Sequence, residues 1–210
     1  MLVDTKRVLA IGAHPDDLEY GCLGYLLKLA ASSELHLFCA SLGSAGAPSS
    51  GEARYAETMS ALSVLNAENF WVRKKKGIDE HDFGEVLHDL ESMVDEVAPS
   101  LILVHSPHDT HQEHELCYRV LMSASRRRKV SILRYFTVSS TSAFRPDFFV
   151  ELTEDVLNTK IGRLRCHKSQ SDKQYMQPDF IKGFHAFPFT TLHGMDYCEA
   201  YEVERIMHAS

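Results

Sequence analysis

Short apolar runs alternate with helix-like segments along the chain up to Ser140, and this alternation constrains the fold more than any other feature. Five runs have the aliphatic or β-branched character of strands: Val8–Ile11, Leu35–Ala40, Phe70–Val72, Leu101–Val104 and Ile132–Val138. Between them, apolar residues recur at helical spacing over residues 18–31, 52–66, 82–97 and 113–127. Strands alternating with helices form parallel sheets. The sequence therefore predicts an α/β fold, a Rossmann-like three-layer α/β/α sandwich with a mainly parallel sheet of order 3-2-1-4-5.

The pattern is weaker beyond Ser140. Phe148–Leu152 resembles a strand, and Thr153 is typical of the cap of a helix that reaches about His167. Tyr197–Ile206 alternates only in part, which leaves two interpretations open: a last strand or a segment of mixed structure. A chain of 210 residues without repeats or linkers has the size of one domain, so we expect a single domain over residues 1–210.

Charge and cysteine usage narrow the class of protein. The formal net charge of −7 argues against a nucleic-acid partner and against a basic membrane-binding face. The N-terminus has no signal-peptide layout, and no apolar stretch is long enough to span a bilayer. The five cysteines are scattered and form no C-x-x-C pair, so we expect reduced packing residues in a cytoplasmic protein.

Two polar clusters follow two of the predicted strands directly. Ala13–Asp17 comes after the first strand, and Asp109–His114 comes after the fourth. In the predicted sheet order these strands are neighbours, and ligands bind at the crevice between their carboxyl ends. We therefore expect both clusters to open into one crevice, although about ninety residues of chain separate them.

The composition of the clusters suits one zinc ion. Imidazole nitrogens and carboxylate oxygens are standard zinc ligands, and a catalytic site uses three of them. His14 and Asp17 lie three residues apart across a turn, and His111 and His114 lie three apart at the start of a helix. A catalytic zinc would take His14, Asp17 and one of the later two histidines. Asp16 and the remaining histidine would then be free for proton transfer.

Several other polar residues have plainer interpretations. We expect His105 and His108 to be packing or loop residues, and His167 to form hydrogen bonds within the C-terminal part of the chain. Arg54 lies three residues before Glu57, so a surface ion pair on one helix face is as consistent with the sequence as a contact with substrate.

Five segments, in this order, carry a resemblance to a known family. They read AHPDDLEYGCLG (Ala13–Gly24), GEARYAE (Gly51–Glu57), DTHQEH (Asp109–His114), CHKSQ (Cys166–Gln170) and YCEAY (Tyr197–Tyr201). The chain resembles the PIG-L/LmbE-like family of zinc-dependent N-acetylglucosaminyl deacetylases. The first and third segments are specific to that family, and the likeness extends from about residue 8 to residue 203.

The resemblance implies roles for five residues of the two clusters. His14, Asp17 and His114 would be the ligands of zinc, or of another divalent cation. Asp16 would be the general base. His111 would be a second catalytic residue that steadies the tetrahedral intermediate or protonates the leaving nitrogen.

The resemblance gives roles to two further residues, and three residues depart from the family pattern. The resemblance implies that Arg54 touches substrate and that Asp109 orients His111. Glu113 stands where the family has aspartate, Gln112 where proline is common, and Leu23 where glycine is frequent. None of these departures removes an implied ligand.

We therefore expect a zinc-dependent deacetylase that hydrolyses the N-acetyl amide of an N-acetylglucosamine-type amino sugar or its conjugate. Two alternatives remain: a metal-dependent amidase acting on another small amide or a thiol conjugate, and a zinc-binding or sugar-binding module without turnover. The expected partner is a small N-acetylated sugar. Family members are often oligomeric, so a homo-oligomer is expected.

Overall fold

The computed structural model describes residues 3–45, 49–187 and 194–207, and a seven-stranded sheet forms the middle of this part of the chain. The strands are β1 (Arg7–Gly12), β2 (Glu34–Cys39), β3 (Asn69–Val72), β4 (Leu101–His105), β5 (Ser131–Tyr135), β6 (Phe148–Leu152) and β7 (Tyr197–Arg205). They lie in the order β3-β2-β1-β4-β5-β7-β6. The first five pair in parallel, whereas β7 is antiparallel to both of its neighbours. The predicted fold class and the order of the first five strands are thus confirmed.

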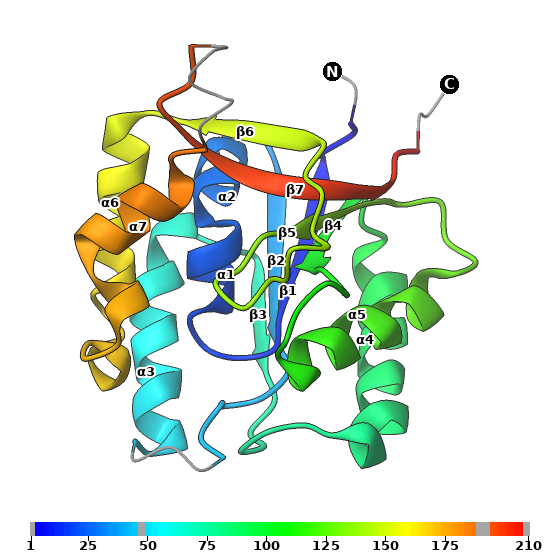
Figure 1. Ribbon diagram of the computed structural model, residues 1–210. Helices are drawn as coiled ribbons and strands as arrows, with labels where there is room; N and C mark the ends of the chain where they lie inside the picture. The colour runs from blue at the N-terminus through cyan, green and yellow to red at the C-terminus, as the bar shows by residue number, and fades with distance from the viewer. Residues whose placement is uncertain (1–2, 46–48, 188–193, 208–210) are drawn as a thin grey trace.

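Helices cover both faces of the sheet (Figure 1). They are α1 (Asp17–Gly21), α2 (Leu23–Leu29), α3 (Gly51–Leu62), α4 (Phe83–Val97), α5 (Gln112–Ser125), α6 (Glu154–Leu164) and α7 (Pro178–His185). Helices α4 and α5 lie on one face, and the others lie on the opposite face. Strand β1 shows why both faces are covered: Leu9 and Ile11 pack against α4 and α5, whereas Val8 and Ala10 pack against α1 and α2. Successive side chains of a strand point to opposite faces of the sheet, so a strand of apolar residues is stable only when helices cover both faces.

The structure differs from the sequence-based expectation at two helices and decides between the two interpretations of one segment. The helix expected over residues 18–31 is divided into α1 and α2 at Cys22, whose φ of −144° is not helical. Tyr197–Ile206, for which two interpretations were open, forms strand β7 up to Arg205. Helix α7 was not predicted, although Pro178 at its first position and the apolar residues Phe180, Ile181 and Phe184 are typical of a short amphipathic helix.

The close approach of α1 to the sheet requires a glycine. A Cβ at Gly21 would overlap the ring of Tyr135, which is fully buried and donates a hydrogen bond from its hydroxyl to the Ile11 carbonyl at 2.7 Å. Because both ring and hydroxyl are held, the ring cannot easily move aside. The first polar cluster, Ala13–Asp17, connects β1 to α1. The contact between Gly21 and Tyr135 therefore also helps to place this cluster.

We expect Gly21→Ala to lower the free energy of unfolding by about 1–3 kcal/mol, the usual cost of overpacking a tight core. Urea denaturation would measure this loss. Gly162→Ala is the matched control, since a Cβ at Gly162 in α6 meets no atom of the described residues within 4 Å. Alanine in place of glycine within a helix should leave stability unchanged or raise it by up to about 1 kcal/mol. Equal stability of the two variants would contradict the contact with Tyr135.

A buried carboxylate ties the last strand to the first helices. Glu199 on β7 accepts hydrogen bonds from the backbone amides of Gly24 and Tyr25, at 2.7 and 2.8 Å, at the start of α2. Its other partners are the buried Lys160 ammonium on α6 at 2.6 Å and the Tyr201 hydroxyl at 2.7 Å. With four donors around it, this carboxylate can be buried without an unpaired charge.

Two of the simpler expectations can be compared directly with the structure. All five cysteines are free and four of them are buried, which agrees with their interpretation as packing residues. Among the described residues, no helix has the length and apolar character needed to cross a membrane. The extent of the domain over residues 1–210 stays a prediction.

Candidate active site

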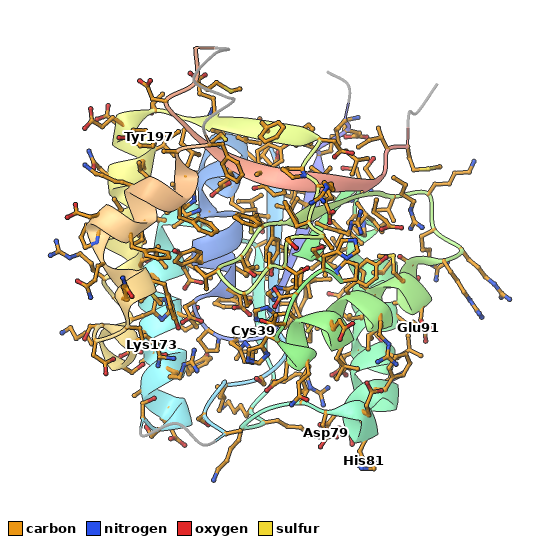
Figure 2. All side chains as sticks on the ribbon, in the orientation of Figure 1. Cys39, Asp79, His81, Glu91, Lys173 and Tyr197 are labelled. Carbon is orange, nitrogen blue, oxygen red and sulfur yellow. The ribbon has the colours of Figure 1, made fainter. Side chains whose placement is uncertain are left out.

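The structure brings the two polar clusters together at the carboxyl end of the sheet. Strands β1 and β4 pair in parallel, with Val8 opposite Leu101, so the segments that follow them leave the sheet side by side. Both clusters line a single cavity of ≈ 650 Å³. Their side chains in its wall are His14, Asp16, Asp17, His111, Glu113 and His114. In Figure 2, Cys39 at the end of β2 and Lys173 in the cavity wall lie toward the lower part of the view, whereas Tyr197 lies at the top.

The turn after β1 has an unusual backbone that frees a carboxylate. Asp16 occupies the N-cap position of α1 with φ of 100°, a region that residues other than glycine rarely adopt. Its side chain forms no capping hydrogen bond with the helix. The Asp16 carboxylate instead lies 3.2 Å from the Arg54 guanidinium. Such strain costs about 1–3 kcal/mol and persists where the surrounding structure enforces it, often at functional sites.

Asp17 lies between the imidazoles of two histidines. One of its oxygens, Oδ2, is 3.4 Å from His14 Nδ1, and the other, Oδ1, is 3.4 Å from His114 Nε2. The second nitrogen of each imidazole faces another carboxylate: His14 Nε2 is 3.2 Å from Glu113, and His114 Nδ1 is 3.0 Å from Asp109. A carboxylate behind a histidine fixes the tautomer and orientation of a metal-binding imidazole. In each histidine, therefore, one ring nitrogen faces a supporting carboxylate and the other nitrogen faces Asp17.

Asp109 has a different partner from the one expected. Its carboxylate faces the ring of His114 and accepts a hydrogen bond from the Thr137 hydroxyl at 2.6 Å. Toward His111 it accepts only from the backbone amide, at 2.8 Å. Asp109 thus contacts His111 through the backbone, and the ring that it reaches is that of His114, because His111 caps α5 and His114 lies one turn on.

Ring orientations distinguish the histidines as candidate ligands. Two overlapping groups have ligand atoms within 4.8 Å of one another and could hold a metal: His14, His111 and His114, and Asp17, His105 and His114. The lone pair of an imidazole nitrogen lies in the ring plane, so two rings can share one ion only if the ion lies in both planes, which rings stacked face to face do not allow. The planes of His14 and His114 are inclined at 50°. Those of His111 and His114 differ by only 19°, and the rings stack 4.6 Å apart. His14 can thus share an ion with either later histidine, but the two stacked rings cannot both bind it as they stand.

The charges around these histidines favour a bound cation. Burial alone would lower the pKa of His14, but Asp17 and Glu113 raise it to about 10. The pKa of His114 is likewise lowered by burial and raised by Asp17 and Asp109, to about 9. Burial would raise the pKa of Asp17, but His114, His105 and His14 hold it well below its usual range. The carboxylates thus attract positive charge to the site, and nitrogen and oxygen donors together suit zinc.

Comparison with known proteins identifies the family. The model of the PIG-L family, described as GlcNAc-PI de-N-acetylase, matches residues 9–125. The chain belongs to the PIG-L family. The uncharacterized deacetylase YaiS of Escherichia coli (strain K12) is 30% identical to this PIG-L protein over 171 residues, which cover 78% of this chain and 91% of YaiS. The chain is accordingly a deacetylase, a hydrolase that acts on an amide bond.

A second relative and a solved structure are also similar to this PIG-L protein. The probable N-acetyl-alpha-D-glucosaminyl L-malate deacetylase 2 of Bacillus subtilis (strain 168) is 27% identical over 188 residues, covering 80% of this chain and 84% of the relative. The solved structure of N,N'-diacetylchitobiose deacetylase from Pyrococcus horikoshii has a TM-score of 0.81 at 20% identity, and covers 95% of this chain and 84% of that one. At that identity the second likeness shows the fold of this PIG-L protein.

Arg54 lines the cavity, and its partners belong to the turn after β1 and the loop after β2, not to its own helix. Its guanidinium donates to the Pro15 carbonyl at 2.7 Å, to the Gly43 carbonyl, and to Asp16. The expectation of a surface ion pair between Arg54 and Glu57 was wrong. Arg54 is buried, and Glu57 accepts hydrogen bonds from the amide and hydroxyl of Ser169. Burial raises the pKa of Asp16 and Arg54 lowers it, with a result of about 6. Arg54 therefore supports the Asp16 carboxylate directly.

The C-terminal part of this PIG-L protein supplies the opposite wall of the cavity. That wall contains Ser169, Gln170, Asp172, Lys173 and Tyr175, all outside the segment matched by the family model. His167 was expected to form hydrogen bonds within this part, and its backbone does so with Leu164 and Gln170. Its imidazole lies 2.8 Å from Glu19 on α1, which also accepts from Thr58 on α3. A short motif around His167 was the only sequence signal for this wall, because the residues after it follow no regular period.

His105 is the site residue that the sequence analysis missed. It was interpreted as a packing or loop residue, and it is indeed fully buried at the end of β4. However, its Nε2 lies 3.1 Å from Asp17, and its ring stacks on His114 with 3.8 Å between centroids. The signal that could have found it is positional: it ends the strand that borders the crevice.

Proposed function

We propose that this deacetylase removes the acetyl group from an N-acetylglucosamine-type amino sugar or its conjugate, with a zinc ion held by His14, Asp17 and His114. The observation that carries the proposal is the position of Asp17 between one nitrogen of each histidine, 3.4 Å from both. The substrate class is supported by the N-acetylated sugars in the names of the Bacillus and Pyrococcus deacetylases. The expected partner is therefore a small N-acetylated molecule.

His114 is preferred over His111 as the third ligand. Its imidazole is buried and is held by Asp109 through Nδ1, which leaves Nε2 toward Asp17. His111 is exposed, and its Nδ1 accepts from the Glu113 amide at 3.3 Å. Three protein ligands leave a coordination position for a small molecule, as catalytic zinc sites do. When bound there, zinc would supply Lewis-acid polarisation of the amide carbonyl and would lower the pKa of water.

Asp16 is proposed as the general base. It lines the cavity next to Asp17, it forms no helix cap, and its pKa of about 6 suits a base that works near neutral pH. Asp16 would take a proton from the attacking water. The hydroxyl then joins the acetyl carbon, the C–N bond breaks, and the proton returns to the nitrogen, so acetate and a free amine leave.

His111 and Arg54 are proposed to assist. Burial and the neighbouring His114 lower the pKa of His111, so its neutral imidazole would donate a hydrogen bond to the carbonyl oxygen as charge develops there. Arg54 holds Asp16 in place and borders the cavity, where it can also touch substrate.

We expect Arg54→Met to move the acidic limb of the kcat/KM profile to higher pH. A general base works only when ionised, so activity falls as pH drops through its pKa. The positive charge of Arg54 lowers the pKa of Asp16, and removing that charge would let the pKa rise above about 6. Measuring kcat/KM across the acidic range tests this, with Arg54→Lys as the charge-retaining control. An unmoved acidic limb in Arg54→Met would argue against Asp16 as the base.

The proposed function is tested by measuring acetate release from a panel of N-acetylated sugars, free and conjugated, together with zinc content. Release from amino sugars by the zinc-loaded protein supports the proposal. Release only from other amides or thiol conjugates would favour the broader amidase. Zinc binding without release from any substrate would favour a binding module and would contradict a catalytic role.

A further inference from the structure

We propose that His105 is a positioning residue of the metal centre, which fixes the Asp17 carboxylate through a hydrogen bond from Nε2 and the His114 ring by stacking. This inference rests on the proposed function, because it assigns a role relative to the proposed ligands. It concerns a residue outside both polar clusters, at the end of the neighbouring strand β4.

His105 is held rigidly enough to position other groups. It is fully buried, and it is the last residue of β4, paired in register with Tyr135 on β5. Its ring lies between two others: it stacks on His114 at 13° and 3.8 Å, and the Tyr135 ring lies 4.7 Å away at 58°. A side chain on a central strand with rings against it has little freedom to change rotamer.

Its Nε2 contacts the carboxylate that both proposed histidine ligands share. Asp17 Oδ2 lies 3.1 Å from His105 Nε2 and also accepts the backbone amide of His14 at 2.7 Å. With one oxygen held from the strand and from the turn, the carboxylate cannot rotate away from His14 and His114. Such support around metal ligands sets their orientation and their affinity for the ion.

The proton of His105 is assigned to Nε2. Its Nδ1 is buried and has no hydrogen-bond partner among the described residues, and an unpaired lone pair costs less there than an unpaired N–H. The Ala13 amide also lies 3.1 Å from Nε2 and would donate to it in the other tautomer, so placing the proton on Nε2 deprives this buried amide of that acceptor. The ionised Asp17 favours the first arrangement, because a hydrogen bond to a carboxylate is about twice as strong as one between neutral groups.

His105 is not itself suited to be a ligand beside His114. Its nitrogen does belong to a group with Asp17 and His114 whose atoms lie within 4.8 Å. However, the two imidazole planes are almost parallel and stacked, at 13°. In-plane lone pairs of stacked rings run side by side and do not converge on one ion. The geometry therefore favours positioning over coordination.

The test is zinc affinity, measured by competition with a chromogenic chelator on the full chain. For His105→Phe, which keeps a ring but removes the donor, we expect the zinc Kd to rise by about 10–100-fold. His105→Gln can place an amide N–H near the same point, and should recover most of that loss. The absorption spectrum of the cobalt-substituted protein should shift in His105→Phe and return toward wild type in His105→Gln, which a purely structural role would not produce.

His36→Phe is the matched control. His36 is also a buried strand histidine stacked on a ring, that of Trp71 at 16°, but it lies on β2 away from the cavity. The zinc affinity and the cobalt spectrum of the His36→Phe variant should equal those of the wild type. Circular dichroism and thermal unfolding would verify that each variant folds. If the phenylalanine ring prevents His105→Phe from folding, His105→Leu takes its place.

The outcomes separate this inference from the proposed function. A wild-type protein that binds no zinc would contradict the proposed function itself. If the wild type binds zinc and releases acetate, and folded His105→Phe or His105→Leu binds zinc equally tightly, the positioning role is overturned. A folded His105→Gln as weak as His105→Phe would overturn the hydrogen bond as its means.

Discussion

An Asp16→Asn variant is expected to keep its zinc and to lose about 10²–10⁴-fold in kcat, the usual contribution of a general base. Asparagine preserves the shape of the side chain and an oxygen that can accept from Arg54, so the turn should survive. It cannot take a proton from water. Zinc content per chain and acetate release under saturating substrate would be measured on the same preparation.

The control for this variant is Asp172→Asn, which removes a carboxylate from the opposite wall of the same cavity. It should keep both zinc and turnover within a few-fold of the wild type, since it is not proposed to move a proton. If Asp16→Asn emptied the site of zinc, the roles assigned to Asp16 and Asp17 would have to be exchanged.

His114→Ala is expected to lose zinc, and acetate release should fall to background with it. The variant removes one of three proposed ligands and leaves the Asp109 carboxylate without its imidazole partner. A tight zinc site depends on each of its ligands. Zinc would be measured by elemental analysis after dialysis, and activity would be measured again after adding zinc in excess.

His111→Ala is the informative comparison, because His111 and His114 lie one helical turn apart with stacked rings. It should retain zinc and lose about 10²–10³-fold in kcat, as expected when one donor to a developing oxyanion is removed. Loss of zinc in His111→Ala together with retention in His114→Ala would reverse the ligand assignment.

The meeting of the two clusters could be predicted from the sequence because it depends on local signals and one topological rule. Each cluster directly follows a recognisable strand, and adjacent parallel strands carry their following loops to the same edge. The residue types then limited the chemistry. The partners of individual side chains could not be predicted in this way: Asp109 reaches His114 and not the ring of His111, because the choice depends on how α5 begins.

His105 and the C-terminal wall illustrate what the sequence conceals. A histidine at the end of an apolar strand looks like a packing residue until the ring and carboxylate beside it are known, and these come from other elements. Ser169 and Gln170 reach the cavity because Glu57 on α3 and Glu19 on α1 hold the turn around them, through contacts across more than a hundred residues of chain. No periodicity reports such pairings.

The insertion of β7 between β5 and β6 has a consequence for biosynthesis. Strand β6 leaves the ribosome before β7, yet β7 is its partner, so β6 cannot join the sheet until β7 emerges. Until then Lys160 and the amides of Gly24 and Tyr25 lack the Glu199 carboxylate that later neutralises and bonds them. A nascent chain halted before Glu199 would therefore expose the unpaired edge of β5, the kind of species that chaperones shield and proteases remove.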